Sequence, residues 1–72
     1  MSVLTPGAPV LITGAGVTGR AVLAALAPLG VRPTLCDDNL TALQPYADQG
    51  IAVIDPAGAV ADIGTYALVV TS

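Results

Sequence analysis

The sequence predicts an α/β fold in which a parallel sheet is built from βα units. Short apolar runs alternate with longer segments of helical periodicity. A glycine-rich run, GAGVTG at residues 14–19, stands where the first apolar run gives way to the first helical segment. We therefore expect one Rossmann-like domain over residues 1–72, with four strands and about three helices. Since connections between parallel strands are nearly always right-handed, the expected strand order is 3-2-1-4.

The first βα unit is predicted at residues 10–13 and 17–27. Its strand is the apolar run VLIT. Its helix has apolar residues at three- and four-residue steps, the spacing of one helix face: Val22, Leu23, Leu26 and Leu29. Pro28 and Gly30 are expected to end this helix, because a proline removes a backbone hydrogen bond and clashes with the preceding turn.

The next unit is predicted as a strand at residues 33–36 and a short helix at residues 40–49. The polar residues 37–39 separate them and offer an Asx-type cap for the helix, and Gly50 ends it. Leu40, Leu43 and Tyr46 are expected on one side of this helix. The third strand, at residues 51–54, is wholly apolar, so we expect it to be covered on both faces.

The last predicted elements are a weak helical turn at residues 57–64 and a strand at residues 67–71. Pro56 suits the first position of a helix, and Asp55 before it is expected to cap that helix. A fifth strand normally follows in such sheets. We therefore expect the fold to be truncated before it, with the fourth strand as an exposed apolar edge. Residues 1–7 are expected to form a loosely held lead.

Composition restricts the classes of function. The chain is 54% hydrophobic, which is a high fraction for a separate soluble domain, and only 10% of its residues are charged, which is a low fraction. This composition indicates a piece that packs against something larger. The chain has two arginines and five aspartates, which give a net charge of -3, so a nucleic-acid partner is not expected. No apolar stretch reaches the ~20 residues of a membrane span, and no basic segment begins a signal peptide, so the expected location is the cytoplasm. Cys36 is the single cysteine and is expected to be a small buried strand residue.

The glycine run favours binding of a phosphate group. Gly14 allows a tight turn, Gly16 lets a ligand approach the backbone, and Gly19 lets the helix pack closely on the strand. The first amides of the helix lack internal partners and carry the positive end of the helix dipole, which favours a diphosphate. The alternative is that these glycines only permit the turn. Asp37 strengthens the binding interpretation, because it follows the second strand, where such folds place a carboxylate against a ribose hydroxyl.

Other side chains give weaker signals. The Thr18 hydroxyl is either a donor to a phosphate oxygen or an ordinary early-helix threonine, and Arg20 is expected to face solvent. No lysine or histidine is present for a phosphate loop or general-base chemistry, and no cluster of metal ligands is visible. Asp37 and Asp38 are adjacent, so on a strand they would point to opposite faces. We expect no catalytic residue and no metal site in this chain.

Three stretches of the chain, residues 10–19, 36–38 and 66–72, resemble the amino-terminal domain of the Mur ligases, and the alanine- and glycine-rich sequence resembles actinobacterial members. This resemblance covers nearly the whole chain. It implies a cytoplasmic three-domain enzyme of peptidoglycan synthesis whose first domain holds the UDP of UDP-N-acetylmuramoyl-L-alanine. The missing central and carboxy-terminal domains would bind ATP with magnesium and bring the D-glutamate to be added. It implies no cofactor in this piece and no catalysis by it alone.

By the same resemblance, the site for UDP comprises residues of the glycine run, the two acids and the last serine: Gly14, Gly16, Val17, Thr18, Gly19, Asp37, Asp38 and Ser72. Val17 and Thr18 would contact the diphosphate, and Asp37 would lie by the uridine. The family often has a threonine and an arginine after this acid, whereas Asp38 and Asn39 follow here. Two alternatives stay open at this point: the NAD-binding domain of an oxidoreductase, and a non-enzymatic regulatory domain of the same fold.

Overall fold

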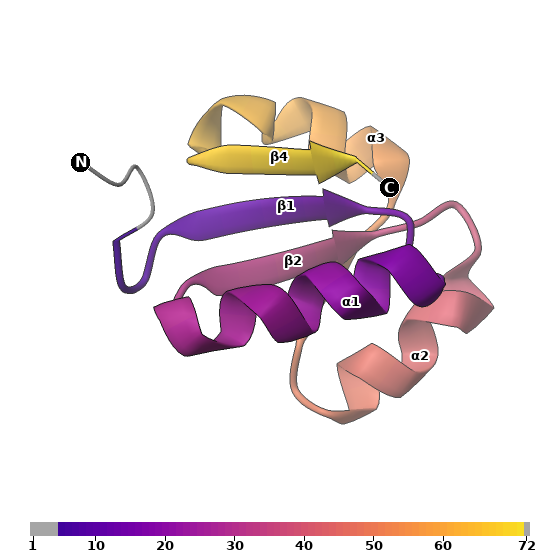
Figure 1. Cartoon of the computed structure of the whole chain (residues 1–72). Helices are drawn as coiled ribbons and strands as arrows, with labels where there is room; N and C mark the ends of the chain where they lie inside the picture. Colours follow the sequence, from indigo (N-terminus) through magenta and orange to yellow (C-terminus); the bar gives the residue numbers. More distant parts are fainter. Residues whose placement is uncertain (1–4, 72) are drawn as a thin grey trace.

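The predicted α/β class is confirmed by the computed structural model, which describes residues 5–71. Its elements alternate along the chain as expected for βα units (Figure 1). In order they are β1 (Pro9–Thr13), α1 (Val17–Leu26), η1 (Ala27–Leu29), β2 (Arg32–Cys36), α2 (Leu40–Asp48), β3 (Ala52–Ile54), α3 (Pro56–Ala61), η2 (Ile63–Thr65) and β4 (Leu68–Thr71), where η marks a short 3-10 helix.

The sheet has the predicted strand order. Its four strands are all parallel and lie in the order β3-β2-β1-β4. In the register of the sheet, Thr13 is level with Cys36 on one side and with Thr71 on the other, and Cys36 is level with Ile54. The strands therefore end together, so the segments that follow them meet at one edge of the sheet.

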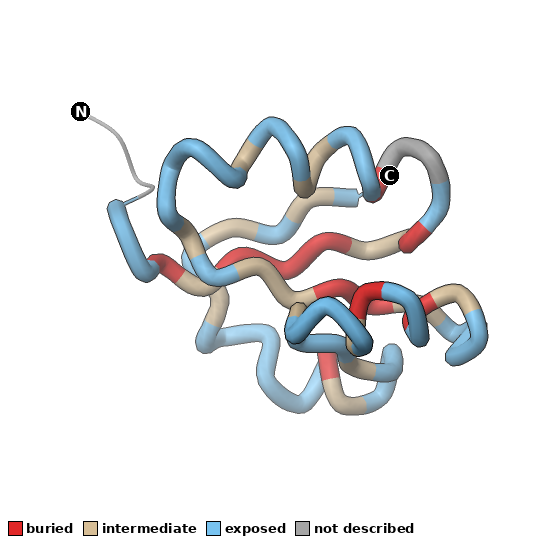
Figure 2. Tube along the Cα trace, turned by 90° about the horizontal axis from the view of Figure 1, so that it is seen from below, coloured by how far each residue is buried: buried red, intermediate tan, exposed pale blue. Residues whose placement is uncertain are grey.

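Helices cover both faces of the sheet. Figure 1 shows α1 and α2 on one face and α3 on the other. Since neighbouring strand residues point to opposite faces, Val10 and Ile12 pack with α1 and α2, while Leu11 packs with α3. Figure 2 shows the buried residues as a band through the middle of the molecule, with the outer surfaces of the helices exposed. No helix within residues 5–71 has the length and apolar character needed to cross a membrane.

The helix ends follow their sequence signals. The Asn39 side-chain oxygen Oδ1 accepts from the Thr41 amide at 3.1 Å, and the Asp55 carboxylate accepts from the Gly58 amide at 2.9 Å. Both caps were predicted and both are confirmed. Gly30, with φ of 69°, closes the 3-10 turn that follows α1.

Three expectations were wrong. The third strand is not covered on both faces: β3 is an edge strand, and Val53 is 37% exposed. Leu40 does not join the core, because it stands at the first position of α2 and is 65% exposed. Of the expected loose lead, residues 1–4 lie outside the described residues, but Gly7 is held, since its amide donates to Gly30 and its carbonyl accepts from the Arg32 side chain.

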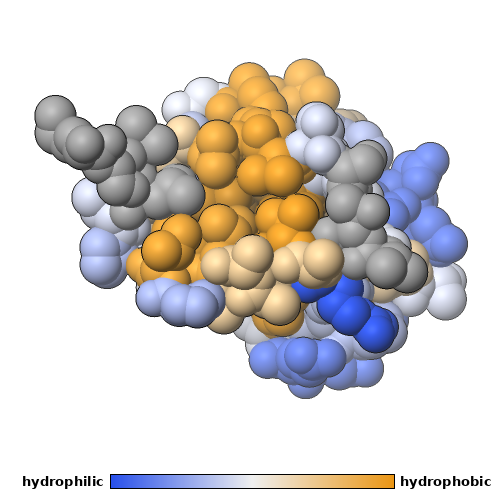
Figure 3. Space-filling model, viewed as in Figure 1, coloured by the Kyte–Doolittle hydropathy of each residue, from blue (hydrophilic) through white to orange (hydrophobic). Residues whose placement is uncertain are grey.

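Apolar side chains also remain on the surface. Val60 on α3 is 72% exposed, Ile63 is 50% exposed and Val69 on β4 is 40% exposed. Among the described strands, β4 pairs with β1 alone and so forms the second edge of the sheet. Figure 3 shows apolar residues across the middle of one face and hydrophilic residues along its right-hand and lower border.

The close packing of α1 against the end of β1 depends on Gly19. A Cβ at this position would overlap the carbonyl oxygen of Gly14 and lie 3.1 Å from its carbonyl carbon. Both are backbone atoms, which cannot move without displacing the loop. The predicted role of Gly19 in helix–strand packing is therefore confirmed.

We predict that Gly19→Ala lowers the free energy of unfolding by about 2 kcal/mol or more, because the added methyl group forces the helix away from the strand. Denaturant unfolding followed by circular dichroism measures the change. Gly64→Ala is the matched control, since a Cβ at Gly64 would meet no atom within 4 Å. Equal stability of the two variants would contradict the packing role of Gly19.

Candidate functional site

The carboxyl edge of the sheet contains a pocket of about 310 Å³. It is lined by residues from the ends of β1 and β2 and from the start of α3: Thr13, Gly14, Cys36, Asp37, Asp38 and Pro56. The carboxyl ends of strands are where ligands bind in open parallel sheets. The structure thus brings Gly14, the first residue of the predicted glycine run, and both predicted acids to one pocket.

The first part of the glycine run is held by the protein itself. Gly14 has φ of 89°, the left-handed region that favours glycine. Its amide donates to the Cys36 carbonyl at 2.8 Å. The Ala15 amide donates to Oδ2 of Asp37 at 3.0 Å, and the Ala15 carbonyl accepts from the Tyr46 hydroxyl at 3.3 Å. Residues 14 and 15 are therefore anchored to the β2–α2 unit.

The second part of the run forms the start of α1. The helix begins at Val17 after Gly16, which provides no side-chain cap. The Arg20 amide donates to the Gly16 carbonyl at 3.0 Å, and this bond closes the first turn of the helix. The amides of residues 17–19 lie ahead of that bond, at the positive end of the helix dipole. A Cβ at Gly16 would meet no atom within 4 Å, so the space on that side of Gly16 is open. This arrangement suits an anion.

Asp37, which was expected to contact a ligand, also holds two backbone segments of the protein together. Its Oδ2 accepts from the Ala15 amide, and its Oδ1 accepts from the Asn39 amide at 2.9 Å. These bonds, the one from Ala15 first, hold the pKa of the Asp37 carboxyl below its usual range, because they stabilise the charged form. The carboxylate is therefore ionised at neutral pH. Its predicted contact with a ribose or uridine stays a prediction.

The other acids and the cysteine occupy different positions at this edge. Asp38 is exposed and lines the same pocket as Asp37. The expectation of opposite faces assumed that both acids lie on a strand, and that assumption was wrong because β2 ends at Cys36. Asp55 caps α3. Cys36 is 5% exposed, as predicted, and burial together with the charge of Asp37 raises the pKa of its thiol.

Part of the predicted site lies outside the residues and side chains that the structure describes. Ser72 is outside the described residues, and so are the side chains of Val17 and Thr18. Their proposed contacts with a diphosphate stay predictions. Within residues 5–71, no group of three or more histidine, cysteine, aspartate or glutamate side chains is placed to hold a metal ion.

Sequence reasoning missed Tyr46 as a residue of the site. The periodicity of α2 placed it correctly in the core, where it is 7% exposed. Its hydroxyl, however, reaches a loop residue 31 positions earlier in the chain. The available signal was chemical: a buried tyrosine needs a partner for its hydroxyl, but the sequence does not show which partner.

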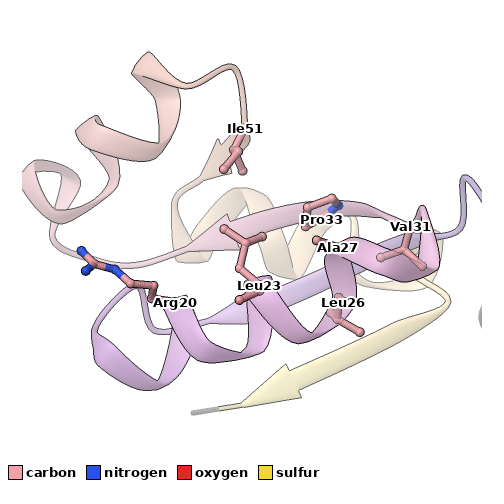
Figure 4. A pocket seen from close by; sticks show the side chains of 8 residues that line it. Arg20, Leu23, Leu26, Ala27, Val31, Pro33 and Ile51 are labelled. Carbon is pink, nitrogen blue, oxygen red and sulfur yellow. The ribbon is translucent and has the colours of Figure 1, made fainter.

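A larger apolar hollow of about 470 Å³ lies between α1 and the β2–β3 side of the sheet (Figure 4). It is lined by Arg20, Leu23, Ala24, Leu26, Ala27, Val31, Pro33 and Ile51. Arg20 extends from one end of it, and the other lining side chains are apolar (Figure 4). A charged diphosphate would be desolvated here without a set of donors, so we assign the candidate site to the smaller pocket.

Comparison with known proteins identifies the family. The chain is 70% identical over 69 residues to the UDP-N-acetylmuramoylalanine–D-glutamate ligase of Mycolicibacterium smegmatis, a match that covers 96% of this chain and 14% of the relative. It is 60% identical over 72 residues to the ligase of the same name from Mycolicibacterium vanbaalenii, covering 100% of this chain and 15% of the relative. The chain belongs to the Mur ligase family. The resemblance predicted from the sequence is thereby confirmed.

The Mur ligase relatives are much longer than this chain. A third relative, the ligase of that name from Mycobacterium leprae, is 54% identical over 76 residues, which are 16% of its length. The chain thus spans only 14–16% of the length of these three relatives. No family model matches the chain. No solved structure matches it significantly.

We predict that protonation of Asp37 destabilises the fold. Its pKa is lowered in the folded state relative to the unfolded value of about 3.9, so its stabilising effect is complete above that value and is lost as the pH falls through the folded pKa. The free energy of unfolding of the unchanged chain should therefore fall more steeply below about pH 4 than that of Asp37→Asn. Denaturant titrations across this pH range measure the difference.

The control for this titration is Asp62→Asn, an exposed aspartate away from the pocket. Its profile should keep the steep acid limb of the unchanged chain. If Asp37→Asn also kept that limb, the hydrogen bonds from Ala15 and Asn39 would not be the source of the acid sensitivity.

Proposed function

We propose that this chain is the amino-terminal domain of a cytoplasmic Mur ligase and holds the UDP portion of UDP-N-acetylmuramoyl-L-alanine while D-glutamate is added. The main support is the start of α1 at the carboxyl edge of the sheet, where Gly16 provides no side-chain cap, a Cβ at Gly16 would meet no atom within 4 Å, and Gly14 lines a pocket of about 310 Å³. The second support is the name of the relatives, which contains UDP-N-acetylmuramoylalanine and D-glutamate. A nucleoside diphosphate fits both.

The charges favour one direction for the nucleotide. The diphosphate would lie against the amides of residues 16–19, where the helix dipole is positive. The uridine would extend toward Asp37 and Asp38, because two carboxylates repel a phosphate but accept hydrogen bonds from ribose hydroxyls or from a uracil N–H. Gly14, Gly16 and Gly19 would form the backbone surface against which the diphosphate lies. Val17, Thr18 and Ser72 would make the remaining contacts with the diphosphate.

The chemical step of the ligase would take place on other parts of the enzyme. ATP, bound with magnesium, would supply the phosphoryl group that activates the substrate carboxylate toward the amine of D-glutamate. Such a transfer needs cations around the phosphates, and this chain has two arginines and no lysine. The residues present do not fit an ATP site, so we assign no step of phosphoryl transfer to them.

We predict that the 72-residue chain alone forms no product from UDP-N-acetylmuramoyl-L-alanine, D-glutamate and ATP. Release of inorganic phosphate, measured with a chain purified free of any full-length ligase, should equal that of a protein-free blank. Substrate-dependent phosphate release by the chain would show that it contains catalytic groups and would contradict the division of labour proposed here.

We predict that UDP shifts the backbone amide resonances of residues 16–19 in the chain and that Gly16→Ala abolishes most of this binding. The methyl group meets no protein atom, so folding is retained at a cost of about 1 kcal/mol or less for the poorer cap. It does occupy the space that the diphosphate needs, and we expect the affinity for UDP to fall at least about tenfold.

Two controls make the UDP titration specific. Gly64→Ala adds the same methyl group at another open position and should bind UDP as the unchanged chain does. NAD is the competing ligand, and shifts of the same amides with NAD but not with UDP would favour the oxidoreductase alternative. Because neighbouring domains would complete the binding cleft, the affinity of the chain alone is expected to be weak.

A further inference from the structure

Ala15 is held by its two backbone groups at once. Its amide donates to Asp37 at 3.0 Å, and its carbonyl accepts from the Tyr46 hydroxyl at 3.3 Å. Both side chains come from the second βα unit, whereas Ala15 lies in the connection of the first unit. The loop is therefore positioned by a part of the protein that is distant in sequence.

The Tyr46 bond fixes the direction of the next amide. A trans peptide unit is planar, and its C=O and N–H groups point in opposite directions. No cis peptide is present in the described residues, so the Ala15 carbonyl and the Gly16 amide form one such plane. When Tyr46 holds the carbonyl on the α2 side, the Gly16 amide points away from α2. A hydrogen bond to the carbonyl also polarises the peptide and makes its N–H a better donor.

Tyr46 is itself well fixed. It is 7% exposed and lies in the core cluster with Val10, Ile12, Leu35 and Leu43. Its helix, α2, begins at the cap made by Asn39. A side chain locked by packing loses no further freedom when it makes a hydrogen bond, so it holds the loop at little entropic cost.

We propose that Tyr46 is a positioning residue for phosphate binding: through its hydroxyl it orients the Ala15–Gly16 peptide so that the Gly16 amide faces the diphosphate. This role rests on the proposed function, because it concerns the same amides. Tyr46 does not contact the ligand. It acts on the diphosphate end of the site alone, so its effect is the same for any ligand that carries a diphosphate.

The test is Tyr46→Phe, which removes the hydroxyl and keeps the buried ring. Its matched control is Tyr66→Phe, since Tyr66 packs against the opposite face of the sheet with Leu11 and Cys36. We expect Tyr46→Phe to speed hydrogen exchange of the Ala15 amide about fivefold relative to that of Ile12 in β1, because Ala15 is then held through its amide alone. Affinity for UDP and for inorganic pyrophosphate should weaken by the same factor of about five.

The outcomes separate this role from the proposed function. Tyr66→Phe should leave exchange at Ala15 and both affinities unchanged. Equal behaviour of the two tyrosine variants would overturn the role of Tyr46, and so would a loss of UDP affinity with no change for pyrophosphate. Absence of UDP binding by the unchanged chain would instead count against the proposed function, while the exchange rates still decide whether Tyr46 holds the loop.

One measurement needs no variant and covers the case in which Tyr46→Phe fails to fold. In the unchanged chain, the Tyr46 hydroxyl proton should exchange slowly enough with water to be observed, because it is buried and donates to the Ala15 carbonyl. The hydroxyl of Tyr66 provides the internal comparison. If Tyr46 showed no such proton, the hydrogen bond to Ala15 would not persist in solution and the proposal would fail.

Discussion

The fold and the candidate site both depend on the close approach of α1 to the end of β1. Gly19 lies so near the Gly14 carbonyl that a side chain at position 19 would overlap it. This contact lets the helix begin at the edge of the sheet and brings its first amides beside the ends of β1 and β2. The positive end of the helix dipole then lies at this edge, and its effect is concentrated in the first turn. A helix displaced by a side chain at position 19 would take its amides away from that edge.

The backbone amides of the glycine run are divided between the protein and the open pocket. The amides of Gly14 and Ala15 already donate to Cys36 and Asp37, whereas those of residues 17–19 lie in the first turn of α1, ahead of the bond from the Arg20 amide to the Gly16 carbonyl. In a chain with a net charge of -3, the partial positive charge that this edge offers to an anion comes from backbone dipoles at the start of α1. Asp37 adds a negative charge beside them, which the bonds from Ala15 and Asn39 stabilise. The site is thus suited to a ligand with an anionic part and a hydrogen-bond-donating part, side by side.

Local sequence signals predicted much of this structure, but they could not predict contacts between residues that are distant in the sequence. The strand order follows from right-handed connections, and the caps by Asn39 and Asp55 follow from residue type and position. Periodicity placed Tyr46 in the core, but it carries no information about which atom the hydroxyl meets 31 residues away. Val53 was misjudged for a related reason: an apolar run shows that a strand can be buried, whereas exposure at a sheet edge depends on the neighbours that the fold supplies.

The anchoring of the loop explains how a glycine-rich segment can serve as a defined binding surface. Glycine has more backbone freedom than other residues, so a free loop containing Gly14 and Gly16 would have to be ordered by its ligand, at a cost in affinity. Here three hydrogen bonds, to Cys36 and Asp37 and from Tyr46, order residues 14 and 15 before any ligand arrives. The entropy of the turn is then lost during folding, where the buried ring of Tyr46 offsets it by its packing in the core. The glycines leave the backbone uncovered for a ligand, while the second βα unit supplies the rigidity that glycine lacks.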